Sequence, residues 1–179
     1  FVGIKIFPFV VFNLYLSKWP KRTNMANELP PFSCSHSPNV PELLTRLNCS
    51  IAISTYQAGK VIFISAKDPQ QLIQLPRTFN KPMGIALNGN KMAIATRHEV
   101  VVLQDVPEVA VNYPKQPNKY DALFMPRAVY YTGELDIHDL HFTGQGLMAV
   151  NTRFSCLSLI NDQYSFTPIW KPAFIQSMQ

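Results

Sequence analysis

The sequence predicts an all-β protein, a partial β-propeller of about three blades with one short N-terminal helix. A short apolar phrase occurs three times, at Ser50–Thr55, Met92–Arg97 and Met148–Arg153. Each copy alternates as a strand does, and each leads through a turn or kink into a second apolar strand. Periods of about 40–55 residues with several strands per unit are typical of four-stranded propeller blades.

The first predicted element is a helix, which follows a Pro-rich polar lead at residues 30–35. It spans Pro41–Leu47, because proline suits the first helical turn. Leu43, Leu44 and Leu47 recur at helical spacing.

The rest of the chain is predicted as strand and turn, because Gly, Pro and Asn interrupt its apolar alternation. Strands are expected at residues 48–56, 60–66, 71–75, 83–87, 91–96 and 99–104, and again at 128–131, 140–142, 147–152, 156–160 and 165–169. Asn88-Gly89 is a two-residue hairpin signal. The Pro-rich stretch 105–126 is predicted to be a long loop.

The second and third copies also align beyond the phrase. Residues 85–89 match 140–144 at an offset of 55, and residues 92–94 match 148–150 at an offset of 56. Gly146 is then a one-residue insertion, and Arg97 and Arg153 fall at equivalent positions.

Charge gives little support to a nucleic-acid partner. The net charge is +5, but Lys5, Lys18, Lys21 and Arg22 all precede residue 25, where there is no acidic residue. Without these four, Lys and Arg exceed Asp and Glu by one. The remaining chain has no basic cluster to contact phosphates, so no nucleic-acid binding is predicted.

Residues 1–24 have three possible explanations. They could form a membrane anchor, but Phe1–Leu16 is short for a span of about 20 residues and contains Pro8. They could form a signal peptide, but the main basic cluster follows the apolar run. We favour a non-native or disordered leader before a start at Met25, which predicts a cytoplasmic protein without a membrane segment.

The cysteines fit this compartment. Cys34, Cys49 and Cys156 are odd in number and widely spaced, which predicts reduced thiols and no zinc site. A Cys34–Cys49 bridge in an exported form is the alternative. No metal site is predicted, because His138 and His141 are three residues apart and would lie on opposite faces of a strand.

The densest polar cluster is residues 134–139, which contains Asp136, His138 and Asp139 and follows Tyr131. A histidine between carboxylates can be a tuned base, a metal ligand or a structural relay. The simplest interpretation is that His138 and Asp139 hydrogen-bond this loop to a neighbouring blade.

Arg97 and Arg153 could converge on one opening and hold an anionic ligand, with Asn151 beside them. The alternative is an inter-blade salt bridge, for example to Asp136 or Asp139. The candidate ligand-binding residues are therefore Arg97, Tyr131, Asp136, His138, Asp139, Asn151 and Arg153. The sequence contains no GxSxG, Walker A, GxGxxG or HExxH motif. It assigns no catalytic residue and no cofactor.

Two long segments, 127–140 (RAVYYTGELDIHDL) and 149–157 (AVNTRFSCL), resemble hallmark segments of an uncharacterised, mainly bacterial family. The resemblance covers nearly all of residues 25–179. It implies a β-propeller-like domain of unknown function, without an assigned activity. Because members of that family are longer, residues 25–179 are expected to be the N-terminal part of the domain, truncated at the C-terminus.

The predicted function is a binding or scaffold module with a protein or a small anion as its partner. The alternative is an enzyme of the hydrolase or lyase type, with a site at the ring mouth around Asp136, His138, Asp139 and Arg153. A third interpretation is structural, in which the apolar repeat surface pairs with another chain.

Overall fold

A computed structural model describes residues 2–4, 10–14, 34–114 and 117–175. These residues form thirteen strands and two short helices. The strands are β1 (Val2–Ile4), β2 (Val10–Leu14), β3 (Ile51–Thr55), β4 (Lys60–Asp68), β5 (Gln71–Thr78), β6 (Ile85–Asn88), β7 (Lys91–Ala95), β8 (Glu99–Asp105), β9 (Ala122–Tyr131), β10 (Ile137–Thr143), β11 (Gly146–Asn151), β12 (Cys156–Ile160) and β13 (Thr167–Trp170). The helices are α1 (Val40–Leu47) and α2 (Pro107–Val111).

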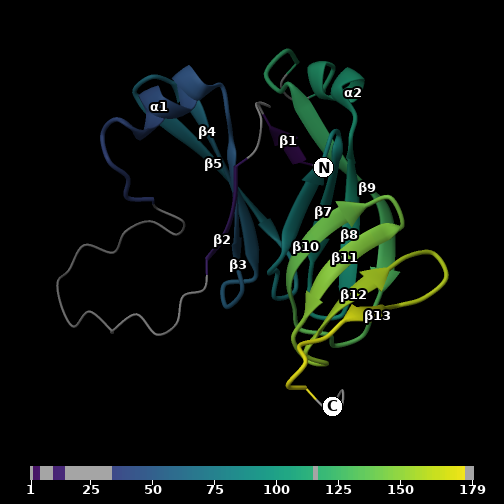
Figure 1. Cartoon of the computed structure of the whole chain (residues 1–179). Helices are drawn as coiled ribbons and strands as arrows, with labels where there is room; N and C mark the ends of the chain where they lie inside the picture. Colours follow the sequence, from purple (N-terminus) through teal and green to yellow (C-terminus); the bar gives the residue numbers. More distant parts are fainter. Residues whose placement is uncertain (1, 5–9, 15–33, 115–116, 176–179) are drawn as a thin grey trace.

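The strands form three sheets that follow one another along the chain (Figure 1). The first sheet has the order β2-β3-β4-β5, the second β1-β9-β8-β7-β6 and the third β10-β11-β12-β13. Consecutive strands from β3 onward pair antiparallel within each sheet, whereas β2 pairs parallel with β3. The predicted all-β class and short N-terminal helix are confirmed. No closed ring is found among the described residues.

The three apolar phrases lie on β3, β7 and β11. Within its sheet each is the second strand, but the strand before it differs. β6 and β10 precede β7 and β11 and run antiparallel to them. At the corresponding place beside β3 lies β2, whose residues belong to the predicted leader 1–24. β1 (Val2–Ile4) belongs to the same leader and pairs antiparallel with β9 in the second sheet. The other leader residues are outside the described part of the chain, and the leader's origin stays a prediction.

The long loop expected at residues 105–126 is only partly present. It contains the short helix α2, and β9 begins at Ala122 rather than at residue 128. Pro126 suggested that no strand could run through it. It is accommodated because the β8–β9 ladder has an irregularity between Val102 and Leu103, and Leu103 is opposite Pro126. Proline is tolerated at such bulges because a ladder hydrogen bond is already interrupted there.

The expected insertion at Gly146 is wrong. The β6–β7 hairpin pairs Asn88 with Lys91, and the β10–β11 hairpin pairs Thr143 with Gly146, so both have two-residue turns. Lys91 therefore corresponds to Gly146, 55 positions later, and the offset is constant through both hairpins. The next hairpins keep the expected offset of 56: β7–β8 pairs Ala95 with Val100 and β11–β12 pairs Asn151 with Cys156, so Arg97 and Arg153 are both the second residue of a four-residue turn.

This difference of one residue changes which face the repeated letters occupy, because side chains alternate along a strand. Met92 is fully buried and packs toward the first sheet. Met148 is opposite Leu159, on the face turned away from the second sheet. Its neighbours Leu147 and Ala149 are the residues that pack inward.

The three sheets lie face to face (Figure 1). Two apolar layers fill the spaces between them, and a third lies between α1 and the first sheet. α1 packs on one face of the first sheet in a cluster with Ile51 and Ile64. The opposite face, with Ala52 and Phe63, packs against the second sheet. The buried residues of this core are Ala52, Val61, Phe63, Ile85, Met92, Ile94, Leu103, Ala122 and Phe124. The other face of the second sheet meets the third sheet: Ala86, Ala93, Ala95, Val100 and Val102 pack with Leu135, Ile137, Leu140, Leu147, Ala149 and Ile160.

The second and third sheets approach closely at Gly84, just before β6. A Cβ atom at Gly84 would lie 2.8 Å from the Cα atom of Asp139 and 3.1 Å from the backbone nitrogen of Leu140. Asp139 is 55 positions after Gly84, so corresponding places on β6 and β10 meet. Glycine allows this backbone approach because it has no side chain.

Candidate functional site

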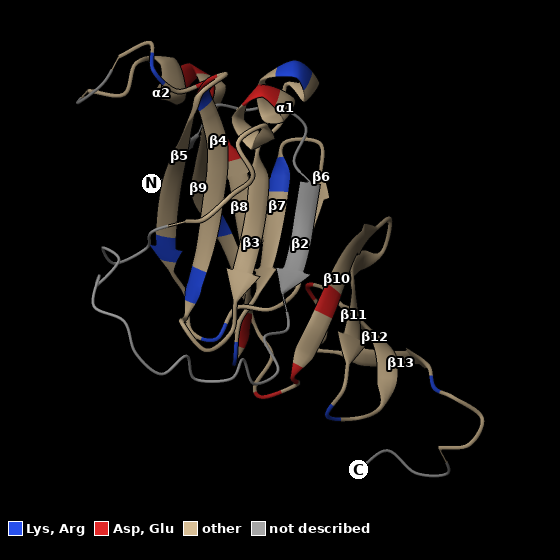
Figure 2. Cartoon of the chain, turned by 90° about the vertical axis from the view of Figure 1, so that its left-hand side faces the viewer, with Lys and Arg blue, Asp and Glu red and all other residues tan. Residues whose placement is uncertain are grey.

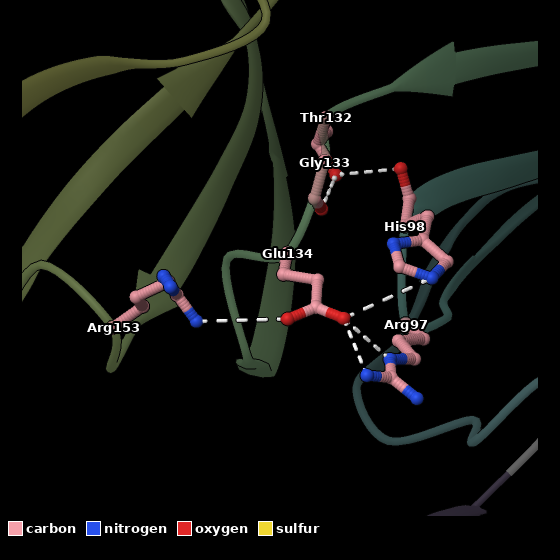
Figure 3. Close-up of polar contacts among 6 residues, drawn as sticks. All are labelled: Arg97, His98, Thr132, Gly133, Glu134 and Arg153. Carbon is pink, nitrogen blue, oxygen red and sulfur yellow. Dashed lines mark hydrogen bonds and ion pairs between the residues drawn. The ribbon is translucent and has the colours of Figure 1, made fainter.

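The candidate site is a corner between the second and third sheets, where two of the predicted residues meet one carboxylate. Arg97 lies in the turn between β7 and β8, and Arg153 lies in the turn between β11 and β12. Glu134 lies between β9 and β10, in the segment that links the two sheets. In Figure 3 its carboxylate lies between the two guanidinium groups.

The two contacts differ in closeness. Arg97 Nε donates a hydrogen bond to Glu134 Oε1 at 2.7 Å, and Arg97 Nη2 lies 2.5 Å from the same oxygen. Arg153 Nη1 lies 3.6 Å from Glu134 Oε2, which is within ion-pair range and beyond a normal hydrogen bond. His98 Nε2 is 3.9 Å from Oε1 (Figure 3). Glu134 therefore holds Arg97 tightly and Arg153 loosely.

The electrostatic effect on Glu134 follows from these neighbours. The hydrogen bond and the charge of Arg97 lower the pKa of the Glu134 carboxyl below its usual value, and His98 and Arg153 add to this effect. The carboxylate thus stays ionised near neutral pH. With Arg97 and Arg153 both charged, the corner has one positive charge in excess when His98 is neutral.

Backbone contacts fix the Glu134 side of the corner. The carbonyl of His98 accepts hydrogen bonds from the backbone N–H groups of Thr132 and Gly133, at 2.9 and 3.0 Å. The Thr132 hydroxyl donates to the same carbonyl at 3.2 Å. Gly133 has φ of +69°, a conformation that favours glycine and turns the chain toward Glu134.

The turn that contains Arg153 is attached to the same linking segment. The Thr152 hydroxyl donates to the carbonyl of Asp136 at 2.7 Å. The backbone N–H of Arg153 donates to the carbonyl of Leu135 at 3.3 Å. The backbone of residues 134–136 therefore positions the Arg153 turn, while the Glu134 side chain faces its guanidinium.

The other predicted residues do not join this ion-pair group. Asp136 is exposed, and it is its carbonyl that holds the Arg153 turn. Asp139 Oδ1 accepts a hydrogen bond from the backbone N–H of Leu140 at 2.9 Å. Tyr131 is 71% exposed at the end of β9. His138, on β10, is half-buried.

Asn151 lies inside the molecule instead of at the corner. It is 1% exposed, and its Oδ1 accepts a hydrogen bond from the backbone N–H of Phe154 at 3.1 Å. Its Nδ2 and the hydroxyl of Ser158 are buried without a hydrogen-bond partner among the described residues. Asn151 therefore shapes the β11–β12 turn from within, which is a structural contact.

The described residues also bear on metal and thiol chemistry. No group of three or more His, Cys, Asp or Glu side chains within them could hold a metal ion. The described cysteines are free, and Cys49 and Cys156 are buried. Burial raises the pKa of both thiols, which disfavours the reactive thiolate. No helix in the described part of the chain is long and apolar enough to cross a membrane.

Sequence reasoning did not select Glu134 or His98. Glu134 belongs to the polar run 134–139, but Asp136 and Asp139 were the acids expected to pair with the arginines. The available signal was the Gly133-Glu134 pair, which places an acid directly after a glycine turn. His98 makes its main contact through its carbonyl, and backbone contacts of this kind have no signature in a side-chain pattern.

Comparison with known proteins gives one match. The family model described as "Domain of unknown function (DUF4915)" matches residues 38–179. No curated protein and no solved structure matches the chain. The matched range starts just before α1 and includes all three sheets from β3 onward, together with Glu134 and both arginines. The chain belongs to the DUF4915 family, a family whose function is not characterised.

Proposed function

We propose that this chain is a non-catalytic binding module, built from consecutive propeller-like blades, that holds an acidic group of its partner at the Glu134 corner. The observation that carries the proposal is the meeting of Arg97 and Arg153 on one carboxylate, although they come from turns of two different sheets. The partner is either a small anion or a carboxylate of another protein.

The geometry supports binding at Arg153 in particular. Arg97 directs two of its nitrogens at Glu134, whereas Arg153 has only the longer contact at 3.6 Å. A guanidinium carries five N–H donors in a planar fork that matches a carboxylate or a phosphate. The Arg153 side chain is 52% exposed, so an incoming anion can reach these donors.

The corner fits binding better than catalysis. The enzyme alternative requires Asp136, His138 or Asp139 to converge with Arg153 on one open site. The described ion pair of Arg153 is with Glu134, an acid whose lowered pKa makes it a poor proton acceptor or donor near neutral pH. The buried free thiols of Cys49 and Cys156 fit a reducing compartment, which supports the proposal that the protein is cytoplasmic.

The test is a titration of the chain with citrate and with inorganic phosphate, observed through the arginine Nε–Hε signals in NMR spectra. We expect saturable shifts of the Arg153 signal that weaken at high salt, because the contact is exposed. The variant Arg153→Gln should weaken anion binding at least tenfold, and Arg127→Gln, on exposed β9, should leave it unchanged. Equal loss in both variants, or no saturable shift, would contradict the proposal.

A further inference from the structure

The basic residues of this chain are unevenly distributed along the sequence. Residues 43–98, which contain strands β3–β7, have Asp68 as their single acidic residue. Their seven lysines and arginines are Arg46, Lys60, Lys67, Arg77, Lys81, Lys91 and Arg97. A segment with such an excess of one charge attracts partners of the opposite charge. The positions of these residues in the fold therefore indicate where such a partner would lie.

Contacts between strand ends place Lys60 and Lys81 at one end of the first sheet. Lys60 begins β4, and its Nζ donates a hydrogen bond to Thr78 Oγ1 at the end of β5. In Figure 2 this end of β4 and β5 is blue, because Lys60 and Arg77 lie there. Lys81 Nζ lies 5.1 Å from the centroid of the Tyr56 ring, which directly follows β3. Both ammonium groups therefore lie where β3 ends and β4 begins.

The loop that contains Lys81 is joined to the Glu134 corner. The backbone N–H of Arg97 donates a hydrogen bond to the carbonyl of Asn80 at 2.9 Å. The side chain of Arg97 contacts Glu134, which Arg153 faces from the third sheet. A row of positive groups thus follows one end of the three sheets, and we name it the basic rim: Lys60, Lys81, Arg97 and Arg153.

Acidic residues at this end of the sheets limit the kind of anion that fits. Glu134 lies between the two arginines, and Glu99 is half-buried at the start of β8. Asp136 and Asp139 are exposed at and near the start of β10. A nucleic acid or a polyphosphate carries a charge at every unit, so it would bring phosphates against these carboxylates. A peptide can place uncharged residues opposite them and acidic residues opposite the cations.

We propose that the partner is an acidic peptide segment of another protein, which lies across the basic rim with carboxylates on Lys81 and Arg153. This inference rests on the proposed function, in which Arg153 holds an acidic group of the partner. The guanidinium binds a carboxylate through paired donors, and the ammonium binds one as a point charge. The ring of Tyr56, 38% exposed beside Lys81, adds an apolar contact for the peptide.

The length of the segment follows from the sheet spacing. Stacked sheets lie about 10 Å apart, so a rim that crosses three sheets is about 20 Å long. An extended chain covers about 3.3 Å per residue, and about six residues therefore span the rim. A peptide of this length reaches both Lys81 and Arg153, which a small anion held at the corner does not.

The experiment is fluorescence anisotropy of the whole chain with two labelled peptides of seven residues in low salt. One peptide has four glutamates that alternate with serines, and the other has glutamine in place of each glutamate. We expect saturable binding of the glutamate peptide that weakens at high salt, and at least tenfold weaker binding of the glutamine peptide. Both measurements use the native chain, so they do not depend on the folding of a variant.

Two lysine variants locate the contact. Lys81→Gln should weaken binding of the glutamate peptide about threefold to fivefold, as expected for the loss of one charge contact at the surface, and Lys81→Arg should retain it. The affinity for citrate at Arg153 should not change in Lys81→Gln. The matched control is Lys91→Gln, which removes the same charge at the exposed start of β7, the end of that strand away from Arg97. It should leave both affinities unchanged.

Equal losses in Lys81→Gln and Lys91→Gln would overturn the proposal, because the peptide would then respond only to net charge. Equal binding of the two peptides would also overturn it, as would tighter binding of a polyphosphate with the same number of charges. Citrate binding at Arg153 without tighter binding of the glutamate peptide would overturn this proposal alone. The absence of any saturable shift at Arg153 would contradict the proposed function, and this proposal with it.

Discussion

Replacing Gly84 with alanine should separate the second sheet from the third. The new Cβ atom would lie 2.8 Å from the Cα atom and 3.0 Å from the carbonyl carbon of Asp139. Ordinary contact begins at about 3.4 Å, so the two backbones must part by about 0.6 Å, and neither can rotate away as a side chain would. Overpacking of this kind costs about 1–3 kcal/mol. In a chain of this length, each kcal/mol lowers Tm by about 2–4 °C.

The assay is urea unfolding followed by circular dichroism, with Gly144→Ala as the control. A Cβ atom at Gly144 would have no atom within 4 Å. Both substitutions restrict the unfolded chain to a similar degree, an effect of about 0.4–1 kcal/mol in favour of the folded state. The difference between the two variants therefore isolates the contact with Asp139. Equal free energies of unfolding for Gly84→Ala and Gly144→Ala would refute the close approach of β6 and β10.

Three further predictions concern single side chains. The lowered pKa means that the Glu134 carboxylate stabilises the fold above the pKa it has in the unfolded chain, and that this stabilisation is lost as pH falls through its folded-state pKa. Glu134→Gln should therefore make the free energy of unfolding depend less on pH on the acid side, measured by urea unfolding between pH 3 and 7 in low salt. A profile parallel to that of the native chain would contradict this. Ser158→Ala should leave the free energy of unfolding unchanged or raise it, because the hydroxyl has no described partner; a loss above about 1 kcal/mol would show that it has one. A thiol reagent should label Cys34 quickly in the native chain, and Cys49 and Cys156 only after unfolding; rapid labelling of all three would contradict the burial.

Much of the fold follows from local signals. The Pro41 start and leucine spacing predicted α1 within one residue of its observed start, and apolar alternation predicted the strands around the Gly89 and Gly144 turns. These features depend on residues close in the chain, so the sequence contains them directly. The start of β9 was not predicted, because Pro126 breaks a local pattern and is tolerated only by a bulge in the partner ladder.

The register of the third sheet shows a different limit. The resemblance between Met92 and Met148 placed the change from an offset of 55 to one of 56 before β11, whereas the strand pairing keeps 55 through the β10–β11 hairpin and has 56 in the β11–β12 hairpin. Gly146 begins β11 with φ of +139°, and a Cβ atom there would lie 2.4 Å from the carbonyl oxygen of Ile160. Glycine is required at that place by a contact with another strand, and a comparison of letters within the chain does not reveal it.

The candidate site was predicted in part for a similar reason. Arg97 and Arg153 were expected to converge, and they do approach one carboxylate. Both are the second residue of the four-residue turn after the repeated strand, as the repeat predicted. Both arginines contact Glu134, which lies in the segment that links the second and third sheets. These contacts form only when the two sheets are stacked.

The stacking of the third sheet on the second brings Arg97 and Arg153 to Glu134, and a methyl NOESY spectrum tests this stacking most directly. With Ala, Leu and Met methyl groups labelled, we predict cross-peaks that link Ala86 and Ala93 with Leu140 and Leu147, which share one buried layer. The methyl group of Met148 should show no cross-peak to Ala86 or Ala93, because Met148 lies on the opposite face of β11 from Leu147. Cross-peaks from Met148 to these alanines, with Leu147 turned to solvent, would contradict both the register and the stack.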